Sequence, residues 1–380
     1  MKIAILVEIL NKKSGSRAPI ELAIHLAKKH DVYFFAYSYL LDRKTDHELK
    51  ELGIKIILFP YCRPYFLTRF LAALTLPFLL KKFSIDLVSS HACLPLFLGA
   101  MLAQKPIIRT YYGTQQDVWF ERLLPEEKPR HYDKLINQLL NRVILLRENF
   151  FFNHSHKNIA ISKYTREEAK RLYQKDIPYI YLGADSSFAK THFANKNKKR
   201  SDKISFLAIS RLTPYKNFHL LIKAFKKVHQ KIPQTKLVIA GSAPNLRYLN
   251  YLRKLAQGYP VQILVNVSDL RLEKLYKTSD IYLSADRFSF FGLPPLEAAL
   301  FGLPTIALDF AALPEIVIHG QTGLIAHNQK GLTAHMTKLA NNLELAYVFG
   351  QKARRQTQQK FRWQDCARQY QQVFLQVTAS

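Results

Sequence analysis

Short apolar runs that alternate with amphipathic helical segments are the feature of this 380-residue sequence that most restricts its fold. Runs of this kind, each expected to form a buried strand, lie at 3–7, 32–36, 54–59, 86–89, 107–110, 158–161 and 179–182, and again at 204–209, 237–240, 262–265, 281–284 and 305–308. Such alternation predicts a parallel sheet covered by helices on both faces. Because the pattern occurs twice, and because the chain is too long for one ordinary core, we expect an α/β protein with two doubly wound domains.

Composition suggests where the domains divide. The stretch 186–203 is rich in lysine and has little hydrophobic periodicity, as linkers do. We therefore expect a first domain at 1–185, a basic linker at 186–203, a second domain at 204–355 and a C-terminal helix at 356–380. That last helix has Trp363, Cys366, Tyr370, Val373 and Val377 at helical spacing, and we expect it to pack across both domains.

The chain is strongly basic, with 56 Lys and Arg against 28 Asp and Glu and a formal charge of +28. Such an excess favours polyanionic partners, namely nucleotide phosphates, an anionic membrane or nucleic acid, although a generally basic proteome would give the same value. No helix-turn-helix, RRM or zinc-finger pattern occurs, so we expect no nucleic-acid partner.

The three cysteines, Cys62, Cys93 and Cys366, are far apart, and the first apolar run is too short for a signal peptide. Both features favour a cytoplasmic protein.

The apolar stretch 66–80 is shorter than the ~20 residues that a membrane-spanning helix needs. Arg63, Arg69, Lys81 and Lys82 flank its central part. Two interpretations stay open: an ordinary core helix between two strands, or a peripheral contact with an anionic bilayer surface.

Two loops that follow predicted strands contain residues suited to bind a nucleotide. After the strand at 204–209, Arg211 and Lys216 stand in a loop that opens a helix, for which Asn217 is the expected cap. A guanidinium fork, an ammonium group and a helix amino terminus together suit a diphosphate, although a solvated basic loop would look the same.

The loop after the strand at 281–284 leads through Gly292 into a second helix. Gly292 allows a close backbone approach, and Pro294 and Pro295 suit a first helical turn. Glu297, one turn further, offers a carboxylate that could accept two hydrogen bonds from a vicinal diol such as a ribose. A capped helix with a surface glutamate is the simpler interpretation of this segment.

Taken together, the sequence resembles the donor domain of family 4 retaining glycosyltransferases. The resemblance rests on five blocks in the family's order and spacing: 211–216, 237–241, 291–298, 302–307 and 313–324. Shorter matches in the first half, at 86–91, 110–113, 161–162 and 180–185, are compatible with the same family. The resemblance implies a GT-B fold, in which two Rossmann-like domains face a central cleft.

The resemblance also implies roles for individual residues. Arg211, Lys216 and Gly15 would contact the donor diphosphate, and Glu297 would hold the ribose hydroxyls. The loop residues Phe290, Phe291, Gly292 and Leu293 would face the donor sugar and its distal phosphate, and Val265 and Val267 would lie near the base.

Three positions depart from the family pattern. Ser289 stands where the family usually has a glutamate, Tyr112 where it has the histidine of the catalytic pocket, and Ser14-Gly15 where it has a glycine pair. Tyr112 and Ser289 are nevertheless the candidate catalytic positions.

The implied activity is sugar transfer from a nucleotide-sugar donor to a glycan or lipid-linked acceptor, with retention at the anomeric carbon. No Asp-x-Asp occurs, so we expect no metal and no other cofactor, with Arg211 and Lys216 neutralising the leaving diphosphate. Three alternatives remain: a catalytically impaired sugar-nucleotide-binding protein, a GT-B phosphorylase or epimerase, and a nucleic-acid-binding protein. The expected location is the cytoplasm, with the inner membrane face as a peripheral site.

Overall fold

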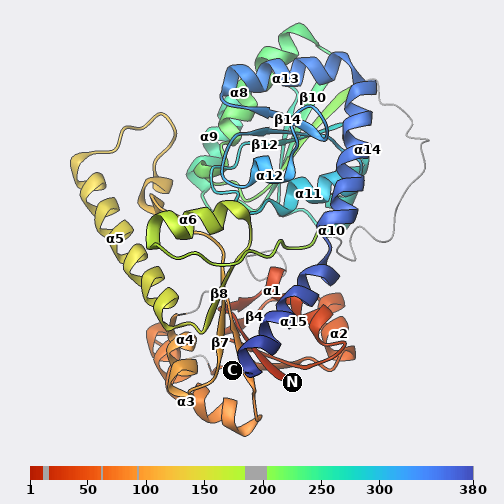
Figure 1. The fold of residues 1–380 in the computed structure, drawn as a ribbon. Helices are drawn as coiled ribbons and strands as arrows, with labels where there is room; N and C mark the ends of the chain where they lie inside the picture. The colour runs from red at the N-terminus through yellow and green to blue at the C-terminus, as the bar shows by residue number, and fades with distance from the viewer. Residues whose placement is uncertain (12–16, 61–62, 92–93, 185–202, 380) are drawn as a thin grey trace. The chain divides into compact units, whose positions relative to one another are not determined.

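The computed structural model describes residues 1–11, 17–60, 63–91, 94–184 and 203–379 (Figure 1). The chain divides into two compact units. One unit comprises Met1–Gly113, Leu145–Gly183 and Trp363–Ser380, and the other comprises Thr114–Ile144 and Ala184–Arg362. Each unit contains one six-stranded sheet in which all neighbouring strands are parallel. The predicted pair of doubly wound α/β domains is therefore confirmed.

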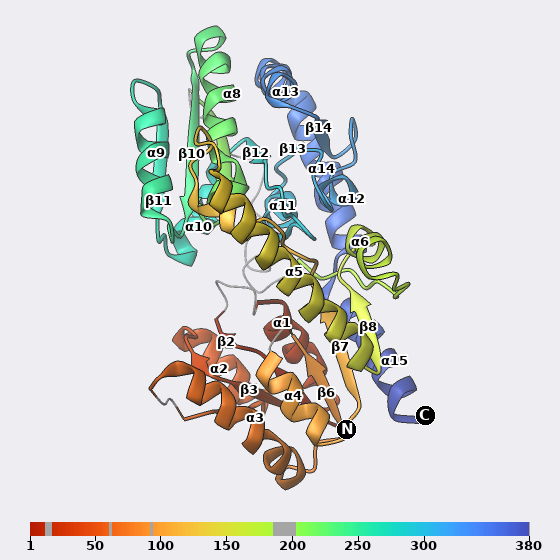
Figure 2. The ribbon, with the colours of Figure 1, turned by 90° about the vertical axis from the view of Figure 1, so that its left-hand side faces the viewer.

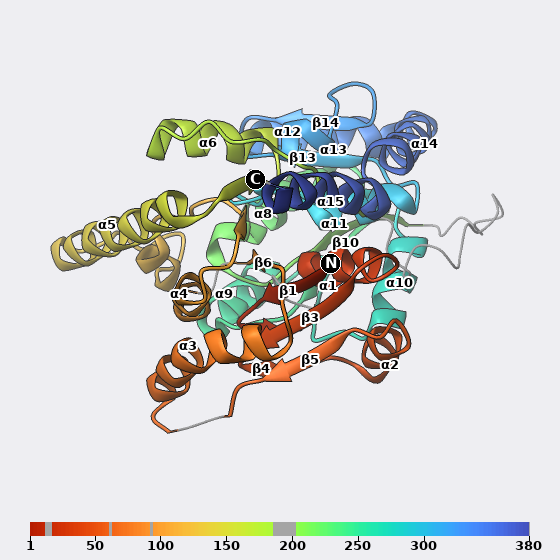
Figure 3. The same cartoon turned by 60° about the horizontal axis from the view of Figure 1, so that its bottom comes forward.

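The sheet of the first unit has the strand order β5-β3-β1-β6-β7-β8. Its strands are β1 (Lys2–Leu6), β3 (Asp31–Ala36), β5 (Lys55–Leu58), β6 (Leu87–Ser90), β7 (Ile107–Tyr111) and β8 (Lys157–Ala160). Strands β5, β3, β1 and β6 can be followed in Figure 3. A separate two-stranded sheet pairs β2 (Ile9–Leu10) with β4 (Ser38–Tyr39). The strand expected at 179–182 forms only an isolated bridge, between Tyr179 and Ala160.

Helices of the first unit cover this sheet. They are α1 (Arg17–Leu26), α2 (Arg43–Glu51), α3 (Tyr65–Lys82), α4 (Leu94–Leu102), the second half of α5 (His131–His154), α6 (Lys163–Tyr173) and α15 (Trp363–Ala379). Helices α3 and α4 pack on each other, and Leu76 and Phe97 join Leu6 and Phe35 of the sheet in one buried cluster. Helix α15 packs against α1.

The sheet of the second unit has the order β11-β10-β9-β12-β13-β14. Its strands are β9 (Ile204–Ile209), β10 (Thr235–Gly241), β11 (Val261–Val265), β12 (Ile281–Ser284), β13 (Thr305–Leu308) and β14 (Gly323–Ala326). Alternate residues of β9 enter different clusters: Phe206 packs with α8, α9 and α13, whereas Leu207 packs with α10 and α11. Both faces of the sheet are therefore covered, as its continuous apolar strands predict.

The helical elements of the second unit alternate with these strands. They are η1 (Val118–Arg122), η2 (Pro214–Lys216), α8 (Phe218–Lys231), α9 (Leu246–Ala256), α10 (Asp269–Thr278), α11 (Leu293–Leu300), α12 (Leu313–Ile316), α13 (Gln329–Asn341) and α14 (Leu343–Lys360). Figure 2 shows α8 and α9 beside β10, with α13 near β14 at the other end of the sheet.

The expected linker at 186–203 lies, except for Lys203, outside the described residues. The expected helix at 356–380 is interrupted, since α14 ends at Lys360 and α15 begins at Trp363. Trp363, Cys366 and Tyr370 are buried as their spacing predicts, and Phe374 completes their face. In the described part of the chain, no helix is long and apolar enough to span a bilayer.

Candidate active site

The strand order of the second sheet reverses between β9 and β12, because β9 leads to β10 on one side and β12 leads to β13 on the other. Ligands of doubly wound sheets bind outside the carboxyl ends of the strands at such a point. The two loops that the sequence singled out follow these two strands directly, at 210–217 and 285–292. The topology therefore brings the predicted donor-binding loops to one place.

Arg211 and Lys216 lie close together through Tyr215. Between them, Leu212 and Tyr215 are buried and hold the loop to the core. The Arg211 guanidinium donates a 2.8 Å hydrogen bond to the Tyr215 hydroxyl, and the Lys216 ammonium lies 5.0 Å from the centre of the Tyr215 ring. The two residues predicted to bind the diphosphate are therefore held near each other by contacts with the same tyrosine.

Asp286 is a member of this site that the sequence did not reveal. Its carboxylate forms an ion pair with Lys216 and accepts a 3.0 Å hydrogen bond from the backbone N–H of Phe288. Asn217 ties the same loops together, because its side chain donates to the Ala285 carbonyl at 2.9 Å. Asn217 does stand at the N-cap position of α8, as predicted, but it has φ 55° and its side chain makes no cap hydrogen bond.

Gly292 sets the shape of the loop that enters α11. Its φ of 100° lies in the region that favours glycine, and a Cβ there would lie 2.6 Å from the Ile316 side chain. Helix α11 begins at Leu293, so Pro294 and Pro295 stand in its first turn as predicted. The loop can therefore present its backbone N–H groups at a helix amino terminus, where anions are favoured.

The aromatic residues of this loop have separate surroundings. Phe291 is buried and packs edge-on against Phe361 at 5.8 Å between ring centres. Phe290 is half-buried and lies 5.9 Å from the Phe288 ring. Ser289 is buried, and its carbonyl accepts a 3.0 Å hydrogen bond from the N–H of Ala312. The packing of Phe291 and the backbone hydrogen bond of Ser289 therefore hold the loop backbone in place.

Glu297 is not the surface glutamate of the simpler interpretation, since only 8% of it is exposed. The hydroxyl of Tyr276 donates to its Oε2 at 2.9 Å. Tyr276 is itself buried, and its ring stacks on Phe301 at 5.2 Å. Tyr276 thus orients the carboxylate. This pairing could not be predicted from the sequence, because the two residues belong to different helices.

The expected base-proximal residues lie at the same edge of the sheet. Val265 ends β11 and pairs with Gly241 at the end of β10, and Val267 follows two residues later. A Cβ on Gly241 would lie 1.8 Å from the Ser210 carbonyl oxygen, so the backbones meet closely where the Arg211 loop begins. Gly15 lies outside the described residues.

In the first unit the strand order reverses between β1 and β6. Tyr112 directly follows β7, and His91 directly follows β6. The His91 Nδ1 lies 2.7 Å from the Tyr112 hydroxyl, and its Nε2 lies 3.1 Å from the Ser89 hydroxyl. Burial lowers the pKa of His91 to about 3, so its imidazole is neutral near pH 7, and burial raises the pKa of Tyr112. The neutral imidazole therefore bridges two hydroxyl groups.

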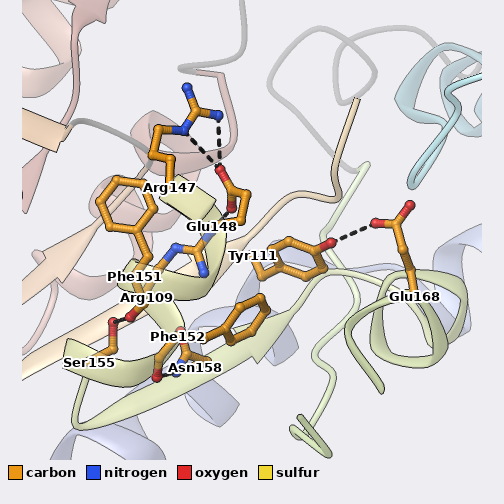
Figure 4. A network of polar contacts seen from close by, with 9 residues as sticks. All are labelled: Arg109, Tyr111, Arg147, Glu148, Phe151, Phe152, Ser155, Asn158 and Glu168. Carbon is orange, nitrogen blue, oxygen red and sulfur yellow. Dashed lines mark hydrogen bonds and ion pairs between the residues drawn. The ribbon is translucent and has the colours of Figure 1, made fainter. Parts of the chain in front are cut away.

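Strand β7, which Tyr112 directly follows, is anchored to α5 by a buried ion pair (Figure 4). Arg109 of β7 pairs with Glu148 of α5, and both side chains are less than a tenth exposed. On the same strand, the Tyr111 hydroxyl donates to Glu168 of α6 at 2.7 Å. These contacts fix β7 against two helices and so position its carboxyl end.

Among the described residues, no three His, Cys, Asp or Glu side chains come together in a group that could hold a metal ion. The charged groups around the switch point of the second sheet include Arg211, Lys216 and Asp286.

Comparison with known proteins assigns both halves of the chain. The family model "Glycosyltransferase Family 4" matches residues 16–188, and the model "Glycosyl transferases group 1" matches residues 189–356. An uncharacterized glycosyltransferase of Methanocaldococcus jannaschii is 24% identical over 93% of this chain and 92% of its own length. A second one from the same organism is 30% identical, but the match spans only 44% of this chain and 45% of that relative.

Solved structures extend the likeness to the whole fold. Sucrose-phosphate synthase from Thermosynechococcus elongatus matches with a TM-score of 0.78 and 17% identity, over 100% of this chain and 99% of that one. HepE of Anabaena, solved in complex with UDP-glucose, matches with a TM-score of 0.77 and 18% identity, over 99% of this chain and 100% of that one. Because the two family models together match residues 16–356 and the fold agrees, the chain belongs to the family 4, group 1 glycosyltransferases of the GT-B type.

Proposed function

We propose that this glycosyltransferase moves a sugar from a nucleotide-sugar donor to a hydroxyl group of a glycan or lipid-linked acceptor, with retention and without a metal ion. The observation that carries the proposal is the placement of Arg211, Lys216 and the buried Glu297 around one topological switch point. A paired guanidinium and ammonium suit a diphosphate, and an oriented carboxylate suits the vicinal hydroxyls of a ribose.

The chemical step follows from the charges. The bond between the sugar C1 and the diphosphate oxygen breaks, and positive charge develops on the sugar ring, as in other glycosyl transfers. Arg211 and Lys216 stabilise the negative charge that grows on the departing diphosphate. The acceptor oxygen forms the new bond to C1, and its proton passes to an oxygen of the departing diphosphate.

UDP-sugars are the donors to test first, because HepE of Anabaena was solved with UDP and with UDP-glucose. A thermal-shift screen over sugar nucleotides with different bases and sugars tests the proposal. A ligand at a hundred times its dissociation constant stabilises a protein by roughly 2.7 kcal/mol, which is a clear shift. If no sugar nucleotide stabilises the protein, the proposed donor site is wrong.

A second function fits two observations. Ser289 stands where the family pattern has a glutamate, and Tyr112 stands where that pattern has a histidine. The chain could therefore bind donors without transferring the sugar efficiently. Slow hydrolysis of a bound donor, measured by release of the free sugar, separates the two. Release that depends on Lys216 supports an enzyme, and binding without any release supports the impaired protein.

A membrane surface is the partner that the first unit favours. Phe66, Phe70, Leu74 and Phe78 follow one another at four-residue intervals along α3, and they are 70%, 58%, 46% and 76% exposed. We call these four residues the α3 stripe. Large apolar side chains gathered in this way mark an interaction surface. Leu102 of α4, which packs on α3, adds a further exposed apolar side chain.

The charge around the α3 stripe points to an anionic lipid surface. From residue 52 to residue 116 the chain has one acid, Asp86, and that carboxylate accepts a hydrogen bond from the backbone N–H of Lys2. The same stretch has seven basic residues. Arg109 is buried against Glu148 and Arg69 pairs with Glu8, which leaves Lys55, Arg63, Lys81, Lys82 and Lys105. Each basic residue near an anionic bilayer contributes about 1 kcal/mol, and apolar side chains add to this by burial.

Sedimentation with phosphatidylglycerol-containing vesicles tests this partner. We expect binding that weakens with salt and is lost in Phe70→Ser/Phe78→Ser, whereas Leu139→Ser on the exposed face of α5 should bind like the wild type. A wild-type protein that stays in the supernatant would refute the membrane contact and leave the proposed reaction untouched.

A further inference from the structure

The segment 114–130 joins β7 to α5, yet it packs within the second unit. Leu124 lies against the main core cluster of that unit. Glu126 accepts a 2.8 Å hydrogen bond from Tyr251, and Glu127 forms an ion pair with Arg247. The segment is therefore attached to the donor-binding unit by an apolar residue and two acids.

Glu121 is the acid of this segment on which the charges of Arg211 and Lys216 act. It stands in η1, which packs against η2, the short helix that ends at Lys216. The backbone carbonyl of Glu121 accepts a 3.3 Å hydrogen bond from Asn245 at the start of α9, and its side chain accepts one from Gln115. The residue is thus held from both sides with its carboxylate half-buried.

The charges that face Glu121 are those assigned to the donor diphosphate. Burial raises the pKa of Glu121, whereas the hydrogen bond from Gln115 and the charges of Arg211 and Lys216 lower it. Lys216 in turn pairs with Asp286. The site thus holds two cations with two carboxylates around them.

The other charged residues of η1 and its cap are engaged elsewhere. Asp117 accepts hydrogen bonds from Asn137 and Asn141 and lies 3.4 Å from the Arg287 guanidinium. Arg122 lies over the ring of Trp119 at 4.0 Å. In η1, the cations of the predicted phosphate site therefore act on Glu121.

We propose that Glu121 is a resident acid of the donor site, which takes up a proton when the diphosphate binds and then donates a hydrogen bond to a phosphate oxygen. The inference rests on the proposed function, because it places the diphosphate at Arg211 and Lys216. An arriving diphosphate repels a carboxylate that shares its cations, so the neutral carboxyl is favoured. The proton comes from solvent, and it returns to solvent when the nucleotide leaves.

Calorimetric titration with UDP in two buffers of different ionisation enthalpy measures this proton. The wild type should take up more protons than Glu121→Gln, whose neutral amide keeps an acceptor for Gln115 but cannot titrate. Any protonation of the phosphate itself is common to both proteins and cancels in the difference. Glu126→Gln, in the same segment but bound to Tyr251, should match the wild type.

The affinity provides a second readout. A single linked proton lets the UDP affinity of the wild type fall by at most about tenfold per pH unit relative to Glu121→Gln as the pH rises. Equal proton uptake in wild type and Glu121→Gln, or a constant affinity ratio across pH, would overturn the role of Glu121 alone. No heat with UDP or with inorganic pyrophosphate would overturn both this role and the proposed function.

Discussion

Lys216 and Asp286 form an ion pair that joins the loop after β9 to the loop after β12, and their side chains are only 13% and 14% exposed. Because the pair lies at the switch point of the sheet, Asp286 holds the ammonium group where a diphosphate is expected. A donor phosphate would therefore compete with Asp286 for Lys216. Because of this competition, removing the charge of Lys216 and removing the charge of Asp286 should change the affinity for UDP in opposite directions.

Replacing Lys216 with Ala should weaken binding of UDP and lower the rate of transfer. A charge-assisted hydrogen bond contributes roughly 1.5–3 kcal/mol, so we expect a loss of about tenfold to a hundredfold in affinity. Asp286→Asn should bind UDP more tightly than the wild type, because the competing charge is gone. Calorimetry on both variants measures this, and an equal loss in both would mean that the pair serves only to hold the loops.

Sugar transfer should persist in EDTA, because two fixed cations are proposed to neutralise the leaving diphosphate. The measurement is the initial rate with and without the chelator, after the donor has been identified by the thermal-shift screen. Activity that EDTA abolishes and Mg²⁺ restores would contradict the proposed mechanism.

The Arg109–Glu148 pair predicts a non-additive effect on stability. Glu148→Gln leaves a buried guanidinium without its main counter-charge, and breaking a buried pair in this way costs roughly 3–5 kcal/mol. The double variant Arg109→Met/Glu148→Gln should recover much of that loss, because no unpaired charge remains. Urea unfolding of the single and double variants gives the coupling. Additive losses would show that the two charges do not depend on each other.

The architecture was predictable because its signals are local. Continuous apolar runs indicate buried strands, and apolar residues at a period of 3.6 indicate amphipathic helices, so the two parallel sheets could be predicted. Loops that directly follow parallel strands lie at one edge of the sheet, so the sequence also predicted that Arg211, Lys216 and Glu297 lie near one another. The apolar run at 66–80 did not tell which side of α3 is buried, since both Leu76 and Phe78 lie in it and only Phe78 is exposed.

The remaining contacts depend on residues that only the tertiary fold brings together. Asp286 and Lys216 are 70 positions apart, and Glu127 and Arg247 are 120 apart. The grouping of 114–144 with the second unit rests on such contacts, so composition placed the whole of 1–185 in one domain. Asparagine is typical of helix N-caps, but the Asn217 side chain donates a hydrogen bond to the Ala285 carbonyl of another loop and does not cap α8.

His91 predicts a specific dependence of stability on pH. Its pKa is lowered to about 3 in the folded chain, mainly by burial, against an ordinary value of 6.5. Between these values the unfolded chain binds one more proton than the folded chain, so stability falls as the pH drops below 6.5, by up to about 1.4 kcal/mol per pH unit. His91→Gln, which cannot titrate, should remove this contribution.

Urea unfolding at about pH 5 and about pH 7 compares the two slopes. Tyr112→Phe is the matched control, because it removes the 2.7 Å hydrogen-bond partner but leaves the imidazole in place, so its slope should resemble that of the wild type. If His91→Gln keeps the full wild-type slope, other buried groups such as His219 account for the acid sensitivity.

The last prediction separates the two ends of the loop that enters α11. Glu297 is assigned to the ribose, which does not react, so its loss should mainly weaken binding, by roughly 1.5–3 kcal/mol for a charge-assisted bond. Glu297→Gln is the sharper variant, because its amide oxygen still accepts from Tyr276 and leaves no buried hydroxyl unsatisfied. Ser289→Ala should leave UDP affinity nearly unchanged and alter only the handling of the intact donor. Calorimetry with UDP and with the UDP-sugar decides between them, and an equal loss of UDP affinity in both variants would mean that this loop is misplaced against the donor.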